Sequence, residues 1–314
     1  MPKISIQKNI SLAPYTTFKI GGPAKFFIEI KTKEDLLEAV DWAEENKEKF
    51  FILGGFSNVL ISDQGISGLV IKIDNDEISI LGERLDCGAG STLAKASSLA
   101  ISKNLTGLEW TVGIPRATIG GAVRGNAEAF NVAMSNIVET VLIFDALKFK
   151  FKTLSNRDCE FGYRSSVFKK NKNYIIWSVI LKLKKEKPEI VKGLVGQSIK
   201  FRGKNYPKLS SAGSMFKNIP VKLIERDNPK LLEEIKKRGI TRLDNVGAGM
   251  LIDMLGLKGK TIGGAKISLE HANFIVNTGK ATSDDVITLA SYIKQQVRDK
   301  YGVQLEEEVQ YLGF

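Results

Sequence analysis

The chain has 314 residues, 43% of them hydrophobic and 26% charged, which is the composition of a soluble globular protein. This length is sufficient for two domains, or for three small ones, each with its own hydrophobic core. The sequence has no run near the ~18 apolar residues of a membrane span and no apolar signal-peptide core at its start. We therefore expect a cytoplasmic protein with no membrane span.

The net charge and the small number of His and Cys residues limit the kinds of ligand and metal site that we expect. The net charge of +11 favours anionic partners, either nucleic acids or small ligands that carry phosphates and carboxylates. No nucleic-acid-binding motif accompanies the charge, so we expect small ligands and no nucleic acid. Because His271 is the only histidine and Cys87 and Cys159 lack metal-ligand spacing, we expect no metal site. Two reduced core cysteines are favoured over one disulfide.

The first part of the chain alternates strands and a helix and then reaches a glycine-rich loop. Residues 25–30 and 50–53 are predicted strands, whereas residues 1–24 are mostly irregular. Residues 35–46 have the apolar spacing of a helix with one buried face. The second strand continues into Gly54-Gly55-Phe56-Ser57-Asn58, which offers backbone N–H groups and polar side chains at a strand end. This pattern indicates an α/β start with a ligand loop, although a tight packing turn is the alternative for this loop alone.

A second glycine-rich segment follows in the middle of the chain. Residues 107–130 are rich in Gly and Ala and have few polar side chains. Two such loops in one domain favour a large phosphate-bearing cofactor. The other elements predicted here are a small antiparallel region at 68–87, a helix at 91–103, and strands at 140–146, 148–153 and 174–184.

A charged, proline-terminated bridge at 185–188 predicts the main domain boundary. The final helix is predicted to be capped by Thr282 together with Asp285, and its apolar stripe faces a core. The other elements expected after the bridge are helices at 190–201, 229–237 and 247–255, a strand at 274–276 and a closing strand at 304–312.

Two polar segments stand out as candidate sites. The loop Ser210–Asn218 has small residues that allow a sharp turn, then a hydroxyl, a positive charge and an amide at Ser214, Lys217 and Asn218. On the residues alone, a functional loop and a structural loop are equally well supported. The planar guanidinium of Arg164 can bind a carboxylate or a phosphate with two hydrogen bonds, but a single arginine does not by itself identify a functional site.

Eight segments of the chain match one known family and stand in that family's order over nearly the full length. They are Thr16–Ala24, Leu53–Asn58, Gly113–Pro115 with Gly120–Val123 and Asn126–Ala127, Phe161–Ser166 with Phe168–Lys169, Ser211–Asn218, Ala248–Asp253 with Gly256–Gly259, His271–Asn277 and Leu305–Val309. Through these segments the chain resembles the UDP-N-acetylenolpyruvoylglucosamine reductases, the MurB family of flavoenzymes. It resembles the shorter subtype, which lacks an inserted lid segment, because only fifty residues separate Arg164 from Ser214.

The resemblance implies an α+β fold class. Residues 1–186 would form an FAD-binding domain of the vanillyl-alcohol-oxidase (PCMH) type, in two α/β lobes that divide near 66. Residues 187–300 would form a C-terminal α+β substrate domain. Residues 301–314 would form a strand that returns to the FAD domain and carries a catalytic glutamate.

The resemblance also implies the reaction and the residues that perform it. Hydride would pass from NADPH through FAD to UDP-N-acetyl-3-O-(1-carboxyvinyl)-glucosamine, giving UDP-N-acetylmuramate for peptidoglycan synthesis. Ser214 would protonate the adjacent carbon, while Arg164 and Glu308 stabilise the enol-like intermediate. Tyr163, Lys217 and Asn218 would bind the substrate. The implied FAD-binding positions are Gly54, Gly55, Ser57, Asn58, Gly113, Pro115, Thr118, Gly120, Gly121 and Asn126.

Several positions depart from the family pattern. Phe56 and Glu128 replace common glycines, and the segment that begins at Arg116 is one residue longer than usual. These changes affect cofactor and loop geometry and leave the three catalytic positions intact. We expect a monomer. The alternatives are another FAD-dependent oxidoreductase of the same cofactor fold and a basic nucleic-acid-binding protein.

Overall fold

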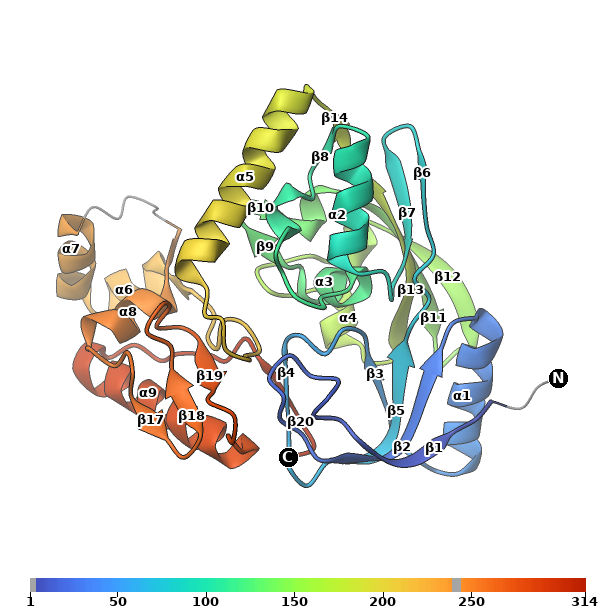
Figure 1. Cartoon of the computed structure of the whole chain (residues 1–314), viewed down its shortest axis with the longest axis horizontal. Helices are drawn as coiled ribbons and strands as arrows, with labels where there is room; N and C mark the ends of the chain where they lie inside the picture. Colours follow the sequence, from blue (N-terminus) through green and yellow to red (C-terminus); the bar gives the residue numbers. More distant parts are fainter. Residues whose placement is uncertain (1–3, 239–243) are drawn as a thin grey trace. The chain divides into compact units, whose positions relative to one another are not determined.

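The computed structural model describes residues 4–238 and 244–314, which form two compact units, each assembled from three segments (Figure 1). Unit 1 comprises Met1–Ser11, Pro23–Phe56 and Ile66–Lys204, and unit 2 comprises Leu12–Gly22, Ser57–Gly65 and Asn205–Phe314. The predicted boundary at 186 lies before a long helix that belongs almost entirely to unit 1. Residues 239–243 of the predicted substrate domain and residues 1–3 lie outside the described residues.

The first sheet of unit 1 has the strand order β1-β2-β5-β3, with β2 and β3 both parallel to β5. Helix α1 is held at its start by a capping box in which Thr32 and Asp35 bond each other's backbone N–H. Its buried residues belong to the same core as the sheet. The bounds are β1 (Gln7–Ser11), β2 (Pro23–Ile30), α1 (Lys33–Glu45), β3 (Phe50–Leu53) and β5 (Ile66–Ile73).

Two expectations for this sheet were wrong. The segment Gln7–Ser11 is a strand antiparallel to β2, although irregular structure was predicted. Four of its five residues are exposed, so an edge strand of this kind has no apolar periodicity to reveal it. Residues 68–73 belong to the parallel strand β5 and not to an antiparallel region, so the first sheet runs past residue 66, where the lobes were expected to divide.

The second sheet of unit 1 is antiparallel throughout, in the order β12-β11-β13-β7-β6. The strands predicted at 140–146, 148–153 and 174–184 and the helix predicted at 91–103 are confirmed to within about two residues. The bounds are β6 (Ile78–Leu81), β7 (Arg84–Gly88), α2 (Leu93–Ser102), β8 (Leu105–Thr106), η1 (Glu109–Thr111), α3 (Ile119–Gly125), β9 (Glu128–Ala129), β10 (Val132–Ala133), η2 (Met134–Asn136), β11 (Val138–Asp145), β12 (Lys150–Ser155), η3 (Arg157–Cys159), α4 (Val167–Lys170), β13 (Tyr174–Lys182), β14 (Lys184–Lys185) and α5 (Pro188–Asn205).

One continuous hydrophobic core joins both sheets of unit 1 and includes Phe144, Phe168 and Val179. Cys87 and Cys159 are buried, unbridged members of this core. Burial raises the pKa of each thiol to about 12, so both stay protonated at neutral pH.

Unit 2 has three small sheets, β15-β16, β17-β18-β19 and β20-β4, around a separate core. Helix α9 begins at the predicted cap, where Thr282 and Asp285 form a capping box. The bounds are β4 (Val59–Ile61), β15 (Ile219–Pro220), α6 (Val221–Asp227), α7 (Pro229–Lys237), β16 (Asn245–Val246), α8 (Ala248–Met254), β17 (Thr261–Ile262), β18 (Ala265–Ile267), β19 (Ile275–Asn277), α9 (Ser283–Tyr301) and β20 (Gln310–Leu312).

The end of the chain differs from the predicted strand at 304–312. Only Gln310–Leu312 forms a strand, and it runs parallel to β4, which also belongs to unit 2. Glu307 makes a single bridge with Phe216. Phe216 lies in a loop and not in a strand, so the pairing of Glu307 does not continue into a β-ladder.

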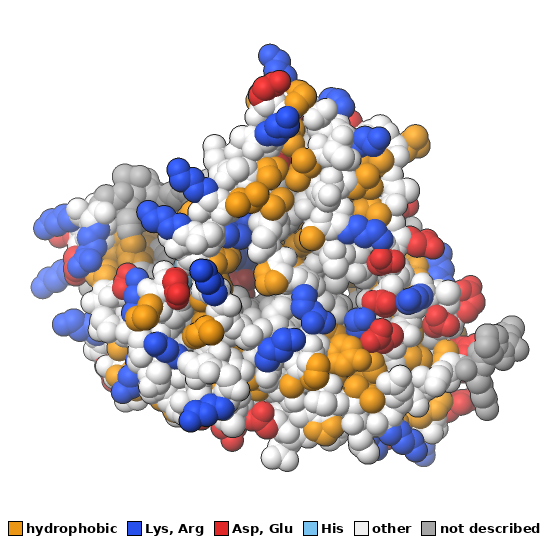
Figure 2. All heavy atoms as spheres, viewed as in Figure 1, with side chains coloured by type: hydrophobic (Ala, Val, Ile, Leu, Met, Phe, Trp, Pro, Cys, Tyr) orange, Lys and Arg blue, Asp and Glu red, His pale blue; other side chains and the backbone are white. Residues whose placement is uncertain are grey.

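Charged side chains cover the surface without a dominant patch on the face shown. Figure 2 shows Lys and Arg side chains scattered and interspersed with Asp and Glu. Within residues 4–238 and 244–314, none of the helices combines the length and the apolar character that a membrane crossing requires.

Candidate active site

Arg164 lies in a tight turn of unit 1. Gly162 and Ser165 exchange two backbone hydrogen bonds of 3.0 and 3.1 Å, so the two residues between them form the tip. Arg164 has a left-handed backbone with φ of 50°, a conformation that disfavours side chains other than glycine by about 1–2 kcal/mol. Such local strain persists only where surrounding contacts hold it, and it is common at functional sites.

Asn126, a predicted cofactor residue, is one of the contacts that hold this turn. It is buried, its Nδ2 donates to the Gly162 carbonyl at 2.9 Å, and its Oδ1 accepts from the Ser135 N–H at 2.9 Å. The Lys169 ammonium donates to the Arg164 carbonyl at 2.9 Å. The structure therefore brings the predicted cofactor residue Asn126 to the turn that carries Arg164.

The two glycine-rich loops of unit 1 meet directly. A Cβ on Gly54 would lie 2.4 Å from the Thr118 Oγ1, and one on Gly55 would lie 1.6 Å from the Arg116 carbonyl oxygen. A Cβ on Gly120 would likewise lie 2.8 Å from the Cβ of Ala89. Only glycine permits these approaches, so the first loop needs its glycines for packing against the second.

Two of the family departures in these loops adopt left-handed backbones. Phe56 has φ of 52° and Arg116 has φ of 55°. Phe56 thus keeps a conformation that glycine adopts without strain, and its ring is buried at 3% exposure. The substitution preserves the turn and adds apolar burial.

The loops also provide features that fit a phosphate-bearing cofactor. Thr118 caps helix α3 by accepting from the Gly121 N–H at 3.3 Å. A Cβ on Gly125 would meet open space, and one on Gly121 would touch only the Thr118 hydroxyl. Backbone donors beside a helix start, with no side-chain bulk, suit anionic oxygens. Gly113 and Pro115 lie on the exposed approach to this helix.

Ser57 and Asn58 belong to unit 2, unlike the glycines before them. The Ser57 carbonyl accepts from the Thr17 hydroxyl at 3.3 Å. The Asn58 side chain donates to the Glu308 carbonyl at 3.3 Å. The predicted cofactor loop is therefore divided, and its second half is bonded to the segment that carries Glu308.

Ser214 lies between a left-handed glycine and two core residues. Gly213 has φ of 84°, and Ser214 itself is half-buried. Met215 and Phe216, at 2% and 1% exposure, anchor the loop in the core of unit 2. The small residues that identified this segment therefore turn the chain, and the two apolar residues fix it.

The segment that carries Glu308 lies alongside the Ser214 loop. The Glu308 N–H donates to the Met215 carbonyl at 2.8 Å, and the Lys217 N–H donates to the Glu306 carbonyl at 2.9 Å. Two predicted catalytic residues, Ser214 and Glu308, are therefore brought together in unit 2, whereas Arg164 belongs to unit 1.

Two of the three consecutive glutamates pair with different lysines. The Glu306 carboxylate accepts from the Lys217 ammonium at 2.9 Å, and Glu307 pairs with Lys294 of α9 at 2.9 Å. Lys217, predicted to bind substrate, is therefore partly neutralised by Glu306. Asn218 is exposed just before β15 in unit 2. Tyr163 lies next to Arg164, whose guanidinium is 5.8 Å from the ring centre.

Sequence reasoning missed Arg202, which supports the glycine-rich segment. Its guanidinium is buried and donates to the Trp110 carbonyl at 2.6 Å and to the Val112 carbonyl at 2.8 Å, just before Gly113. Arg202 continues the buried stripe of α5, and the predicted helix stopped one residue short of it. A buried arginine needs hydrogen-bond acceptors inside the protein. An arginine on the buried face of the helix was therefore the sequence signal that could have identified Arg202.

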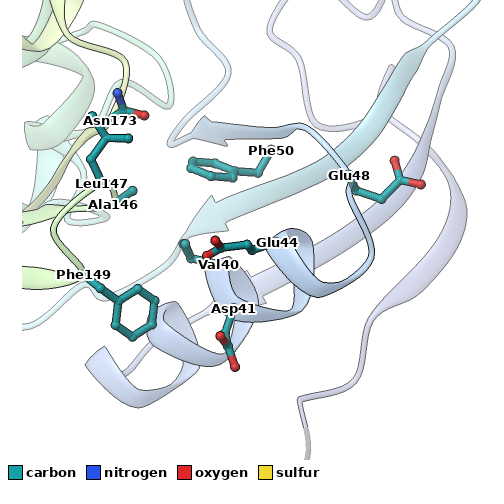
Figure 3. Close-up of a pocket in the computed structure, with 9 residues that line it drawn as sticks. All are labelled: Val40, Asp41, Glu44, Glu48, Phe50, Ala146, Leu147, Phe149 and Asn173. Carbon is teal, nitrogen blue, oxygen red and sulfur yellow. The ribbon is translucent and has the colours of Figure 1, made fainter.

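A separate pocket of about 500 Å³ opens in unit 1, away from every predicted site residue (Figure 3). One wall carries the carboxylates of Asp41, Glu44 and Glu48, and the opposite wall includes the apolar side chains of Leu147 and Phe149. Its acidic wall does not suit anionic ligands. No group of three or more His, Cys, Asp or Glu in the described ranges is arranged to hold a metal ion.

Comparison with known proteins identifies the family. A model of the C-terminal domain of UDP-N-acetylenolpyruvoylglucosamine reductase matches residues 205–312, and a model of an FAD binding domain matches residues 24–148. The chain is 32% identical to the UDP-N-acetylenolpyruvoylglucosamine reductase of Solibacter usitatus (strain Ellin6076), with 100% of this chain and 98% of the relative covered. The chain belongs to the UDP-N-acetylenolpyruvoylglucosamine reductase family.

Other members of this reductase family agree. The enzyme from Anoxybacillus flavithermus (strain DSM 21510 / WK1) is 36% identical, with 98% of this chain and 95% of the relative covered. The crystal structure of the reductase (MurB) from Thermus caldophilus matches with a TM-score of 0.78 and 32% identity, covering 98% of this chain and 99% of that one. The predicted α+β fold with an FAD-binding domain is confirmed.

Proposed function

We propose that this chain is an FAD-dependent reductase that uses NADPH to convert UDP-N-acetyl-3-O-(1-carboxyvinyl)-glucosamine to UDP-N-acetylmuramate. The product is a peptidoglycan precursor, so the activity serves the cell wall, cell shape and cell division. The observation that carries the proposal is family similarity over the whole chain, at 32% identity to a reductase of nearly equal length. In this assignment unit 1 binds FAD and residues 205–312 bind the sugar.

The cofactor is assigned to the two glycine-rich loops. The backbone N–H groups of Gly54 and Gly55 and the capped start of α3 at Thr118 would hold its phosphates. Gly120, Gly121 and Asn126 complete that side of the site. When bound, FAD supplies a ring that takes up hydride from NADPH and returns it to the terminal alkene carbon of the substrate.

Ser214 is assigned as the proton donor. Its Oγ–H would give a proton to the substrate carbon that bears the carboxylate, next to the carbon that receives hydride. A serine hydroxyl is a weak acid, so this role needs fixed geometry, nearby positive charge and exclusion of water. The buried anchors Met215 and Phe216 supply the fixed geometry, which supports the assignment.

Arg164 and Glu308 are assigned to the electron-rich side of the substrate. A guanidinium can hold a carboxylate with two parallel hydrogen bonds and stabilise the enol-like charge that develops there. Glu308 would complete this group together with Ser214, because its backbone already bonds the residue after Ser214. Lys217, Asn218 and Tyr163 would bind the rest of the UDP-sugar.

We further propose that the chain is a cytoplasmic monomer that binds no nucleic acid. On the face shown in Figure 2, basic and acidic side chains are mixed, whereas a nucleic-acid-binding surface concentrates positive charge. The excess of positive charge instead suits three anionic ligands, namely FAD, NADPH and the UDP-sugar.

The test uses the purified protein and its colour. Protein supplied with FAD should be yellow, bleach with NADPH, and recover its colour anaerobically when the enolpyruvyl UDP-sugar is added. Failure to bind flavin would reject the proposal. Bleaching without recovery would favour a different flavin oxidoreductase, and a colourless protein with salt-sensitive binding to a random oligonucleotide would favour a nucleic-acid-binding protein.

A further inference from the structure

The side chain of Asn273 bonds both backbone groups of one residue in the Ser214 loop. Asn273 lies between β18 and β19 and is buried at 4% exposure. Its Oδ1 accepts from the Phe216 N–H at 3.0 Å, and its Nδ2 donates to the Phe216 carbonyl at 2.8 Å. The carboxamide therefore bonds the Phe216 N–H and carbonyl in the way that the backbone of a neighbouring strand would.

The backbone of Asn273 adds a third bond to the same loop. Its carbonyl accepts from the Met215 N–H at 2.7 Å. On the opposite side, the Met215 carbonyl accepts from Glu308, and the Lys217 N–H donates to Glu306. The backbone from Met215 to Lys217 is thus held between Asn273 and the segment Glu306–Glu308.

His271 in turn holds the backbone of Asn273. The Nδ1 of His271 accepts from the Asn273 N–H at 3.2 Å, which requires the ring proton to be on Nε2. The ring packs against Phe274, with 4.9 Å between centroids. Asn273 is therefore fixed by its own neighbours and can serve as a rigid support.

We propose that Asn273 is a positioning residue for Ser214, which sets the direction of the hydroxyl through the backbone of Met215 and Phe216. The inference rests on the proposed function, in which Ser214 is the proton donor. Ser214 directly precedes the held backbone, and Gly213 on its other side has open space around its α carbon. Ser214 therefore receives its geometry from the C-terminal side, where Asn273 acts.

Removing the carboxamide should disturb geometry more than it disturbs folding. The Phe216 N–H and carbonyl would be left buried without partners, which is unfavourable, so the backbone would move to relieve it. A shift of about 1 Å in a reacting group can slow a reaction by about 10²-fold. The step that depends on Ser214 should slow, while the transfer from NADPH to flavin should not.

The experiment separates the two half-reactions of the FAD-loaded enzyme. Flavin is first reduced with NADPH, and the enolpyruvyl UDP-sugar is then added anaerobically while the return of flavin absorbance is followed in a stopped-flow instrument. For Asn273→Ala we expect reoxidation at saturating sugar to slow about 10²-fold. The rate of flavin reduction by NADPH and the sugar concentration that gives half-maximal rate should stay unchanged.

Asn228→Ala is the matched control. The Asn228 side chain also makes one donated and one accepted bond in unit 2, to the Tyr301 carbonyl and from the Leu231 N–H, both at 3.0 Å. This variant should lose thermal stability yet reoxidise at the wild-type rate. If Asn228→Ala slows reoxidation as much as Asn273→Ala does, the effect is general loosening and the inference is wrong.

Asn273→Asp tests the same bond in a variant of nearly identical shape. Its carboxylate lacks the donor for the Phe216 carbonyl, and protonation restores that donor. Burial should raise the carboxyl pKa, so the reoxidation rate relative to wild type should recover as the pH falls. Measuring wild type at each pH corrects for titrations that both proteins share, including that of His271 near Lys258 and Asp253.

The outcomes distinguish the inference from the proposed function. A ratio that is independent of pH, or an Asn273→Ala enzyme that reoxidises at the wild-type rate, overturns the positioning role alone. A wild-type enzyme whose reduced flavin does not react with the sugar overturns the proposed function, and the inference falls with it.

Discussion

Arg164 lies in a four-residue turn whose ends bond to each other, whereas Ser214 precedes a backbone held by a residue 57 positions beyond Phe216. The Arg164 turn has a strained left-handed residue at its tip, and side chains such as Asn126 hold it from outside. The Ser214 loop instead places its left-handed position at Gly213, where no strain arises, and anchors itself through buried Met215 and Phe216.

The difference shows two ways to hold a side chain in place. In the turn, local hydrogen bonds fix the backbone and the strain is stored in Arg164 itself. In the loop, contacts distant in sequence fix the residues after Ser214, so its geometry depends on the packing of unit 2. We therefore expect substitutions near Arg164 to act locally, and those near Ser214 to act through tertiary contacts.

The largest expected effect is that of Ser214→Ala. Loss of the proton donor should slow reduction of the sugar by reduced flavin about 10²–10⁴-fold, while flavin reduction by NADPH continues at the wild-type rate. Single-turnover absorbance measures both steps. Ser210→Ala, in the same loop, should leave both unchanged. Two normal half-reactions in Ser214→Ala would show that another group supplies the proton.

Asn126→Ala should weaken the support of the Arg164 turn. The buried Gly162 carbonyl and Ser135 N–H lose their partners, so the free energy of unfolding should fall by about 1–3 kcal/mol. Alanine at the left-handed backbone of Asn126 adds about 1 kcal/mol. Urea denaturation measures the loss, and single-turnover reoxidation should also slow.

Asn156→Ala provides the comparison for Asn126→Ala. The Asn156 amide donates to the carbonyls of Ser135 and Val138, at 2.9 and 2.7 Å, and does not touch the Arg164 turn. It should lower stability by a similar amount and leave reoxidation unchanged. Equal slowing in both variants would contradict a specific role for Asn126.

Arg164→Gly and Arg164→Ala separate strain from chemistry. Both remove the guanidinium and should stop efficient reduction of the sugar. Glycine relieves the left-handed backbone, so Arg164→Gly should be about 1 kcal/mol more stable than Arg164→Ala in chemical denaturation. A glycine variant that is the less stable of the two would show that the turn stores no strain at this residue.

The smallest expected effect concerns the pH dependence of stability. Burial, with a further contribution from nearby Lys258, lowers the pKa of His271 from its usual 6.5. Between the lowered pKa and 6.5 the unfolded chain binds the proton more readily than the folded one. The stabilisation is therefore complete above about pH 6.5 and is lost as the pH falls through the folded value.

His271→Gln removes this titration and tests it. The free energy of unfolding of the wild type should decrease relative to the variant as the pH falls below about 6.5, with a slope of at most about 1.4 kcal/mol per pH unit. Urea denaturation at several pH values measures the difference. A difference that stays constant would mean that His271 titrates alike in the folded and unfolded states.

Much of the secondary structure was determined by local sequence. The bounds of β3 and α7 follow the predicted segments closely, and α9 begins at its predicted capping box. Apolar periodicity and capping residues identify these elements. Both signals involve residues only a few positions apart, so they do not depend on tertiary contacts. The family motifs likewise identify the candidate residues from their own positions.

Tertiary structure alone decided how those residues are held. The contact of Gly54 and Gly55 with Arg116 and Thr118, and the bonds from Asn273 to Phe216, join segments that nothing in their spacing relates. The same is true of the exposed edge strand β1 and of the bridge from Glu307 to Phe216. Hydrogen bonds between segments that are distant in sequence depend on how the core packs. A local sequence pattern does not show which distant segments will meet.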